Sequence, residues 1–267
     1  MITKKLPVSI VIPCADDTRI KNCLASIDEK VETIVVFNGA TKEVKEIVKN
    51  HNVKIVEIPE RNLAKALNAG IAKSKNKKII FMDSDCRFEK GAIRKLYEGL
   101  TNYSVVKGKV VFESNSYMSG IIANVRDYSY YDTPKPYNPF LGINKDIKKL
   151  IGNYFFDSDI HWTEDADLNT RLKNADIKVN YLFNARVFHP PLSLTHDLRS
   201  AFRYGIGKRI RVEFGKTDGM GTHYTKVSDV INKKGLSAGI YYFVWNIFYS
   251  LGYFYQVIFD PYKIGGK

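Results

Sequence analysis

Asp83 and Asp85 are the residues of this sequence best placed for chemistry. They close segment 77–85, whose apolar run of β-branched and aromatic residues is typical of a buried strand. In an open α/β sheet the ligand lies beyond the carboxyl ends of the strands, so both carboxylates are expected there. Their oxygens suit Mg²⁺ or Mn²⁺, and a diphosphate would complete the coordination. The alternative is that Ser84 or Asp85 only caps the following helix.

A second acidic group, Glu164, Asp165 and Asp167, follows Thr163. A carboxylate here could take a proton from an attacking hydroxyl group. The group could also be structural, because acids in the first turn of a helix are favoured by the helix dipole and Thr163 can act as the cap. Both interpretations stay open at this point.

His189 ends an expected strand, directly before two prolines. An imidazole beside two carboxylates suits Mn²⁺. A hydrogen-bonded loop histidine is an equal alternative, and His196 is a competing candidate seven residues further on.

The elements that must position these residues alternate along the first 85 residues. Apolar runs predict strands over 8–12, 33–37, 53–58 and 79–81, and apolar residues at helical spacing predict helices between them. Asp16, Asp17 and Thr18 are expected to cap the first helix. This alternation is typical of a parallel, doubly wound half-domain.

Beyond Asp85 the pattern changes. A helix is expected up to Leu100, a strand over 104–112, another helix from Thr163 and a strand over 178–188. Segment 113–144 is rich in Tyr, Asn and Pro and shows no clear periodicity. We expect it to be an irregular loop that could cover the site.

Four motifs, in this order, carry a resemblance to a known family. They are Val8-Ser9-Ile10-Val11-Ile12-Pro13, Asn62-Leu63-Ala64-Lys65-Ala66-Leu67-Asn68-Ala69-Gly70-Ile71, Phe81-Met82-Asp83-Ser84-Asp85 (a DXD motif), and Thr163-Glu164-Asp165-Ala166-Asp167-Leu168 with Arg171-Leu172. The chain resembles the family 2 inverting glycosyltransferases, which use nucleotide-diphosphate sugars. The resemblance covers about residues 6–210.

The resemblance implies an α/β fold of the GT-A (nucleotide-diphospho-sugar transferase) type. That fold is a mostly parallel mixed sheet flanked by helices, here followed by an aromatic-rich C-terminal helical tail. We expect a glycosyltransferase domain over 1–215 and a hydrophobic tail over 216–267. Within the domain, 1–112 would bind the nucleotide sugar and 113–215 the acceptor.

The resemblance also assigns roles. Asp83, Asp85 and His189 would hold a divalent metal, Mn²⁺ or Mg²⁺, and Asp165 would be the catalytic base with Glu164 and Asp167 as rivals. A bound metal stabilises the diphosphate leaving group as a Lewis acid, so no general acid is needed there.

The residues expected to bind the donor come from the same motifs. They are Pro13, Ala15, Asp16, Asn38, Lys65, Asn68, Asp83 and Ser84. Ala15, Phe37 and Leu67 depart from the residues common in the family, so the base stays open, with UDP-sugars favoured. The alternative for Lys65 is a solvated lysine on a helix.

Residues 199–211 hold Arg199, Arg203, Lys208, Arg209 and Arg211. We expect a basic helix here, interrupted by Gly205 and Gly207, that supports the diphosphate or faces a lipid headgroup. A solvated basic face is the alternative for many of these charges. The Gln-x-x-Arg-Trp pattern of processive polymerases is missing, which disfavours a cellulose- or hyaluronan-type synthase.

The formal net charge of +13 calls for an anionic partner. No nucleic-acid-binding motif surrounds the scattered lysines, so a phosphorylated substrate or an anionic membrane is favoured over nucleic acid. Three cysteines in no metal-ligand spacing suit a reducing compartment. The amino terminus lacks a signal-peptide pattern.

Residues 236–259 contain no charge, and six of them are Tyr or Trp. A run of this length could span a bilayer. Its many polar-tipped rings instead favour a segment in the headgroup region, or a shallow helical hairpin about Gly252. Lys233 and Lys234 before it suit an anionic cytoplasmic leaflet. A buried helix or a dimer interface is the alternative.

Together these features predict a metal-dependent, inverting hexosyltransferase at the cytoplasmic face of a membrane. It would move a sugar from a nucleotide-diphosphate sugar to a hydroxyl or phosphate group of a glycan or a polyprenyl- or other lipid-linked acceptor. Two alternatives remain. One is a nucleotide-sugar nucleotidyltransferase, although the Gly-rich phosphate loop usual there is missing. The other is a non-catalytic membrane-surface binding protein on the same fold.

Overall fold

An eight-stranded sheet carries strand β4 (Lys78–Phe81), the strand that leads to Asp83, near its centre. The computed structural model describes residues 5–131, 135–219 and 226–261. The strand order is β3-β2-β1-β4-β7-β6-β8-β5. The strands span Val8–Cys14 (β1), Glu32–Asn38 (β2), Lys54–Ile58 (β3), Arg87–Phe88 (β5), Val105–Phe112 (β6), Leu141–Asn144 (β7) and Asn180–His189 (β8).

One half of the sheet is parallel. β1 pairs in parallel with both β2 and β4, and β2 pairs in parallel with β3. On the other side β7 pairs antiparallel with β4 and β6, and β5 pairs antiparallel with β8. Every residue of β1 is buried, as expected for a strand covered on both faces. The predicted α/β fold class, a mixed sheet flanked by helices, is confirmed.

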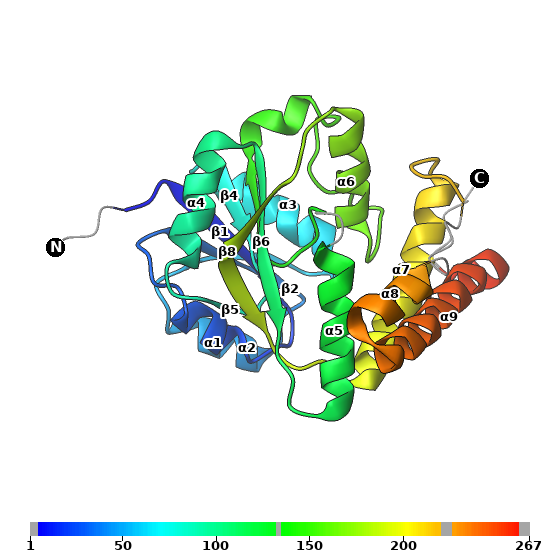
Figure 1. Cartoon of the computed structure of the whole chain (residues 1–267). Coiled ribbons are helices and arrows are strands. Elements are labelled where there is room, and N and C mark those ends of the chain that lie inside the picture. Colours follow the sequence, from blue (N-terminus) through cyan, green and yellow to red (C-terminus); the bar gives the residue numbers. More distant parts are fainter. Residues whose placement is uncertain (1–4, 132–134, 220–225, 262–267) are drawn as a thin grey trace. The chain divides into compact units, whose positions relative to one another are not determined.

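Five helices and a 3₁₀ turn accompany the sheet (Figure 1). They are α1 (Ile20–Ala25), α2 (Lys42–Lys49), α3 (Leu63–Lys73), α4 (Ala92–Asn102), α6 (Glu164–Asn174) and the turn η1 (Lys145–Lys149). α3 approaches β1 so closely that a Cβ on Gly70 would lie 2.3 Å from a methyl carbon of Val11. α4 follows Gly91, so neither Ser84 nor Asp85 caps it, and that alternative is wrong.

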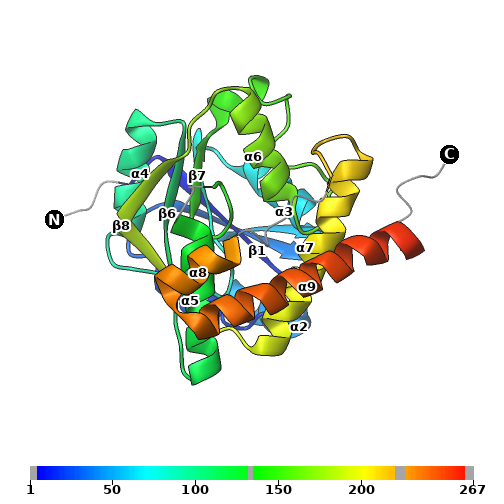
Figure 2. The same ribbon diagram turned by 45° about the vertical axis from the view of Figure 1, so that its right-hand side comes forward.

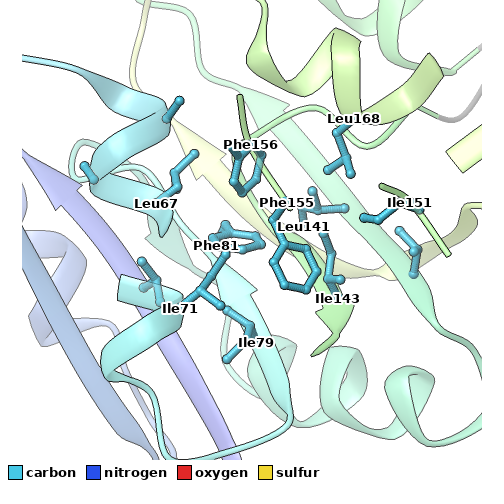
Figure 3. Close-up of a cluster of buried hydrophobic side chains, with 14 of the residues drawn as sticks. Leu67, Ile71, Ile79, Phe81, Leu141, Ile143, Ile151, Phe155, Phe156 and Leu168 are labelled. Atoms are coloured by element: carbon cyan, nitrogen blue, oxygen red, sulfur yellow. The ribbon is translucent and has the colours of Figure 1, made fainter. Parts of the chain in front are cut away.

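A buried apolar cluster joins the end of β4 to the loop before α6 (Figure 3). Phe81 of β4 meets Phe156 edge to face, with ring centroids 5.3 Å apart. Leu67 and Ile71 of α3 lie in the same cluster, as does Leu168 of α6. The strand that carries Asp83 and the helix that carries Asp165 therefore share one core.

The expected irregular loop over 113–144 is wrong for the described residues. Helix α5 (Tyr117–Tyr131) and strand β7 fill most of it. Ile121, Ile122, Val125 and Tyr128 form the buried face of α5. The Ser, Asn and Tyr residues among them obscured the helical period in the sequence. Residues 132–134 of this segment lie outside the described part.

The chain divides into two compact units. The first comprises 1–111, 134–158 and 164–189, and the second 112–133, 159–163 and 190–267. The second unit contains α5 and three further helices, α7 (Leu194–Glu213), α8 (Val227–Lys234) and α9 (Leu236–Phe259) (Figures 1 and 2). The expected boundary between a domain over 1–215 and a tail over 216–267 divides the chain differently, since α7 groups here with α8 and α9.

Both predicted interruptions of the last helices are wrong. α7 runs unbroken through Gly205 and Gly207, and α9 runs unbroken through Gly252. These glycines serve close packing within the second unit. A Cβ on Gly205 would lie 1.9 Å from the Tyr249 carbonyl oxygen, and one on Gly252 would lie 1.9 Å from that of Phe202. Only glycine permits this approach of α7 to α9.

Candidate active site

The turn after β4 presents Asp83 and Asp85. The backbone N–H of Cys86 donates to the carbonyl of Asp83 (3.2 Å), and the Cys23 thiol reaches the same oxygen (3.6 Å). Asp83, Ser84 and Asp85 are partly exposed, whereas Cys23 and Cys86 are buried. The turn is therefore anchored by its backbone, which leaves the side chains of the motif at the end of the strand.

His189 reaches this turn through the pairing of β5 with β8. Arg87 lies opposite Phe188, so the register brings His189 level with Cys86. His189 Nε2 lies 3.6 Å from Asp85 Oδ2. Ligand atoms of Asp85, Cys86 and His189 lie within 4.8 Å of one another, the spacing of a metal site. Neither Asp83 nor His196 belongs to this group among the described residues.

The donor atoms of this group fit a divalent cation. A carboxylate and an imidazole are ligands for Mn²⁺, and Asp83 lies two residues away to add a second carboxylate. The thiol of Cys86 donates a hydrogen bond to Asp85 Oδ1 at 3.3 Å. Burial is the largest cause that raises the pKa of this thiol well above its usual value, and the negative charges of Asp85 and Asp83 raise it further. Cys86 is thus held as a neutral thiol that hydrogen-bonds a metal-ligand candidate, a role that sequence reasoning missed.

Arg19 is a further contact that the sequence did not suggest. Its guanidinium group lies 3.5 Å from Asp85 Oδ2 and forms an ion pair with Asp17. The expected capping of α1 by Asp16, Asp17 and Thr18 is wrong, because α1 begins after Arg19 without a side-chain cap. Asp17 instead accepts a bond from the backbone N–H of Arg19 (2.9 Å) and orients it toward Asp85.

A buried lysine offsets the acidic cluster. Lys107 of β6 has no exposed surface, and its Nζ donates to the carbonyls of Gly108 (3.1 Å) and Pro139 (2.5 Å). Burial lowers the pKa of Lys107 to about 7, opposed by the negative charges of Asp83 and Asp165. Burial and the Asp85 charge raise the pKa of Asp83, and Lys107 counteracts that rise. The alternating pattern of β6 gave no sign that this lysine points inward.

The three acids of α6 have three different environments. Glu164 is buried, its Oε2 makes no hydrogen bond among the described residues, and burial and Asp165 raise its pKa. Asp167 is also buried and forms an ion pair with Arg171 (2.8 Å). Asp165 is partly exposed and interacts electrostatically with Asp83. Of the three, Asp165 has the environment of a carboxylate that a substrate can reach.

Arg171 holds the loop before α6 against that helix. Besides Asp167, it donates to the carbonyls of Ile151 (2.8 Å), Tyr154 (2.9 Å) and Phe155 (2.5 Å). The guanidinium group therefore ties the loop before α6 to the helix itself. Asp167 and Arg171 therefore serve the position of α6, and the Asp167 carboxylate is engaged in this ion pair.

The start of α6 is not capped as a purely structural helix would be. Thr163 Oγ1 is buried and makes no hydrogen bond among the described residues, so it does not cap the acids that follow. Trp162, directly before it, has a φ of 61°, a left-handed backbone that costs a bulky residue free energy. Such strain concentrates at functional sites.

The expected donor-binding residues lie at the carboxyl ends of β1 and β2 and on α3. Asn38 Oδ1 accepts the backbone N–H of Asn62 (2.7 Å), and Asp16 forms an exposed ion pair with Arg61 (2.9 Å). Lys65 forms an exposed pair with Glu60 (2.5 Å). Pro13 and Ala15 lie at and just after the end of β1, where Pro13 is buried and Ala15 partly exposed.

Asn68 has a structural task that the sequence did not reveal. Its amide Nδ2 donates to the carbonyl of Phe156 (2.7 Å), and its Oδ1 accepts the N–H of the same residue (3.3 Å). Asn62 caps α3, because its Oδ1 accepts the backbone N–H of Lys65 (2.9 Å). Its Nδ2 donates to the carbonyl of Ser158 (2.9 Å). The second motif thus fixes the 156–158 segment to α3.

The sequence matches the model of a known protein family. Residues 9–150, more than half of the chain, match the model of "Glycosyl transferase family 2". The chain belongs to glycosyl transferase family 2. It is therefore a glycosyltransferase, and the family supports a nucleotide-sugar donor. No curated protein matches the sequence.

A solved structure shows the same fold as this family 2 chain. The mannosyltransferase PcManGT from Pyrobaculum calidifontis, described in complex with GDP-Man and Mn²⁺, aligns with a TM-score of 0.60 and 14% identity. The alignment covers 96% of this chain and 76% of the mannosyltransferase. At this identity the likeness shows the fold alone, and it extends over the C-terminal helices of this chain as well as the sheet.

Proposed function

We propose that this glycosyltransferase moves a sugar from a nucleotide-diphosphate sugar to an acceptor hydroxyl or phosphate group, with inversion and with Asp165 as the base. One observation carries the proposal. Within the first turn of α6, Asp165 is partly exposed, while Glu164 is buried and Asp167 is bound to Arg171. Glu164 would keep a supporting role beside the base.

The chemistry needs one carboxylate on the acceptor side. The acceptor oxygen attacks the anomeric carbon as its bond to the diphosphate oxygen breaks, and the acceptor proton passes to Asp165. A single displacement of this kind inverts the anomeric carbon.

We propose Asp83, Asp85 and His189 as holders of Mn²⁺ or Mg²⁺. The carboxylate and imidazole of Asp85 and His189 converge, and Asp83 belongs to the same turn. A bound cation would supply Lewis-acid stabilisation of the diphosphate leaving group. The imidazole favours Mn²⁺ over Mg²⁺. Mn²⁺ in the mannosyltransferase of the same fold supports a divalent metal.

For the donor we favour a UDP-sugar, as the family resemblance suggested, with GDP-sugars as the first competitor because PcManGT is described with GDP-Man. Pro13, Ala15, Asp16, Asn38, Lys65 and Ser84 would contact it. Asn68 would act through the Phe156 backbone that it holds.

For the acceptor we propose a polyprenyl- or other lipid-linked molecule, or a growing glycan, at the cytoplasmic face of a membrane. Support comes from the net charge of +13 and from the uncharged α9, which follows Lys233 and Lys234. Contact with the membrane would run through residues 236–259.

The direct test is donor turnover. Purified protein is incubated with Mn²⁺ or Mg²⁺ and a panel of UDP-, GDP- and TDP-sugars, with lipid extract as acceptor source. The proposal expects release of nucleoside diphosphate from one donor only when metal is present, and a product whose anomeric configuration is inverted by NMR.

Other outcomes would overturn it. Release that survives chelation of metal would remove the metal role, and a product with retained configuration would remove the single displacement. Pyrophosphate release from a nucleoside triphosphate and a sugar phosphate would indicate a nucleotidyltransferase. Failure of every donor to bind or react would favour the non-catalytic membrane-surface protein.

A further inference from the structure

Helix α9 reverses the usual distribution of side chains: polar residues are buried and apolar residues are exposed. A helix on a water-soluble protein buries its hydrocarbon side chains and exposes its polar ones. In α9 the buried residues include Asn246 and Gln256, with exposed fractions of 1% and 0%, and three tyrosines. Side chains of pure hydrocarbon lie on the outside.

The outward side chains form one continuous stripe. Successive members are three or four residues apart, which keeps them on one face over the whole helix. The stripe consists of Ile240, Phe243, Ile247, Leu251, Phe254 and Ile258, which are 37–70% exposed. Monomeric soluble proteins rarely expose an apolar patch of this extent unless it binds a partner.

Inward polar groups of α9 form hydrogen bonds within the second unit, although Gln256 Oε1 is buried and makes none among the described residues. Tyr241 donates its hydroxyl to Asp197 of α7, which also pairs with Arg126 of α5. Asn246 Nδ2 donates to the Tyr242 carbonyl (2.7 Å), and Gln256 Nε2 to Asp260 (2.8 Å). The bond from Tyr241 to Asp197 ties α9 to α7, and Gly205 and Gly252 pack the two helices closely. These contacts fix the rotation of α9 about its axis, so the apolar stripe cannot turn inward without breaking them.

The charge around the stripe selects the partner. α9 has no charged residue. α7 has five Arg or Lys, of which Arg211 is buried, against two acids. α8 has two Lys, both in ion pairs, against one acid. Both helices pack on α9. A second copy would bring two chains of charge +13 together, whereas anionic lipid headgroups would attract these flanks.

We infer that the outward face of α9 lies in the plane of an anionic membrane surface, with the stripe in the boundary between headgroups and acyl chains. Helices with one apolar face and a basic flank bind membranes in this way. Among the described residues, no helix is both long and apolar enough to cross a membrane. The inference deepens, and rests on, the membrane contact of the proposed function. It names the face, the depth and the lipid charge.

The test is flotation with vesicles of phosphatidylcholine alone or with phosphatidylglycerol, without donor or metal. We expect binding to the anionic vesicles that weakens as NaCl is raised, and little binding to neutral ones. The variant Phe243→Ser/Ile247→Ser/Leu251→Ser should lower the partition coefficient at least about tenfold, because three apolar side chains no longer enter the bilayer.

A matched control removes the same kind of side chain elsewhere. Ile55→Ser/Leu150→Ser/Phe183→Ser changes three exposed apolar residues of the first unit and should leave vesicle binding unchanged. Circular dichroism checks that both variants fold. Light scattering shows whether the wild-type chain is a dimer that the α9 variant converts to a monomer.

Three results would overturn the inference. They are no flotation of the wild-type chain, an equal loss of vesicle binding in both triple variants, or a wild-type dimer that the α9 substitutions dissociate. The last would assign the stripe to a second copy. Because no sugar transfer is measured, failure here leaves glycosyl transfer untouched. Conversely, a chain that floats but turns over no donor would refute the proposed transfer from these donors and leave the membrane inference intact.

Discussion

α6 and α9 each break the ordinary rule for a helix on a globular protein, in opposite directions. α6 buries two carboxylates, those of Glu164 and Asp167. α9 exposes a stripe of hydrocarbon and buries an asparagine and a glutamine. Both arrangements cost free energy in water, one through desolvated charge and the other through exposed apolar surface.

The comparison supports the two sites that we propose, one in each unit of the chain. Departures from local rules of helix composition concentrate at functional sites. Such departures cost stability, and a functional requirement is the usual reason that a protein keeps them. In the first unit the exception lies in α6, the helix that also carries Asp165, the proposed base. In the second unit the exception is the row of exposed apolar side chains on α9, a surface that would suit contact with lipid. Variants of one region should therefore spare the function of the other.

A large loss of turnover is expected at the metal-ligand candidates. Asp85→Asn removes a charged ligand beside His189, and turnover should fall about 10²–10³-fold, since a Lewis acid contributes several kcal/mol to the transition state. Metal titration should show weaker activation by Mn²⁺. Vesicle binding should not change. The control Asp146→Asn removes an exposed acid of the first unit and should leave turnover intact; a loss equal to that of Asp85→Asn would contradict the assignment.

The ion pair of α6 should rank next, as an effect on stability. Arg171→Met leaves Asp167 buried without its guanidinium partner and frees three carbonyls, so unfolding free energy should fall by about 3 kcal/mol. Urea denaturation measures the change. The double variant Arg171→Met/Asp167→Leu should recover much of the loss, because no unpaired charge remains. A single variant as stable as the exposed-pair control Glu46→Ala would contradict this role.

How much of this could be anticipated from sequence differs between the two units. Up to Asp85 the apolar runs and turn residues specified strands and helices locally, so the sheet and the DXD turn followed. His189 was singled out because it ends an expected strand and because the family resemblance places a histidine there; the structure brings it within 3.6 Å of Asp85. Cys86, Arg19 and Lys107 were missed because the pairing of β5 with β8 and the packing inside the sheet bring them to the site.

In the second unit the sequence misled. Gly205, Gly207 and Gly252 suggested breaks in helices, whereas they permit close packing against other backbone groups. The uncharged run 236–259 was recognised, but not which residues face inward. That depends on the tertiary bonds of Tyr241, which no periodicity contains.

A smaller effect on stability is expected at Glu32. Burial alone would raise its pKa, but hydrogen bonds from Lys54, Ser9 and the N–H of Lys75 outweigh burial and lower the pKa to about 2. Because the folded pKa is depressed, this stabilisation is complete above the ordinary pKa of 4.5 and is lost as pH falls toward 2.

The measurement is urea denaturation of Glu32→Gln and wild type across this pH range. The variant should lose about 1–3 kcal/mol at neutral pH, and the difference should shrink as the medium becomes acidic. A difference that stays constant with pH would contradict the charge-based explanation.

The smallest effect is expected on the outward face of α9. Ile240→Ala should change the unfolding free energy in water by less than about 0.5 kcal/mol, because Ile240 is 57% exposed. Ile122→Ala, a buried position of the same unit, should cost about 2–5 kcal/mol. Thermal unfolding of both variants without lipid tests the contrast, and a large loss at Ile240 would mean that the stripe is covered in solution.

The most direct test of the central claim, that Asp165 is the base of a glycosyl transfer, is the comparison of turnover with donor binding in Asp165→Asn. Asparagine keeps the size of the side chain and removes its basicity. We expect turnover to fall about 10²–10⁴-fold while the donor dissociation constant, measured by calorimetry with Mn²⁺, stays near that of wild type. Turnover within a few-fold of wild type at unchanged donor affinity would contradict the account and pass the role of base to another carboxylate.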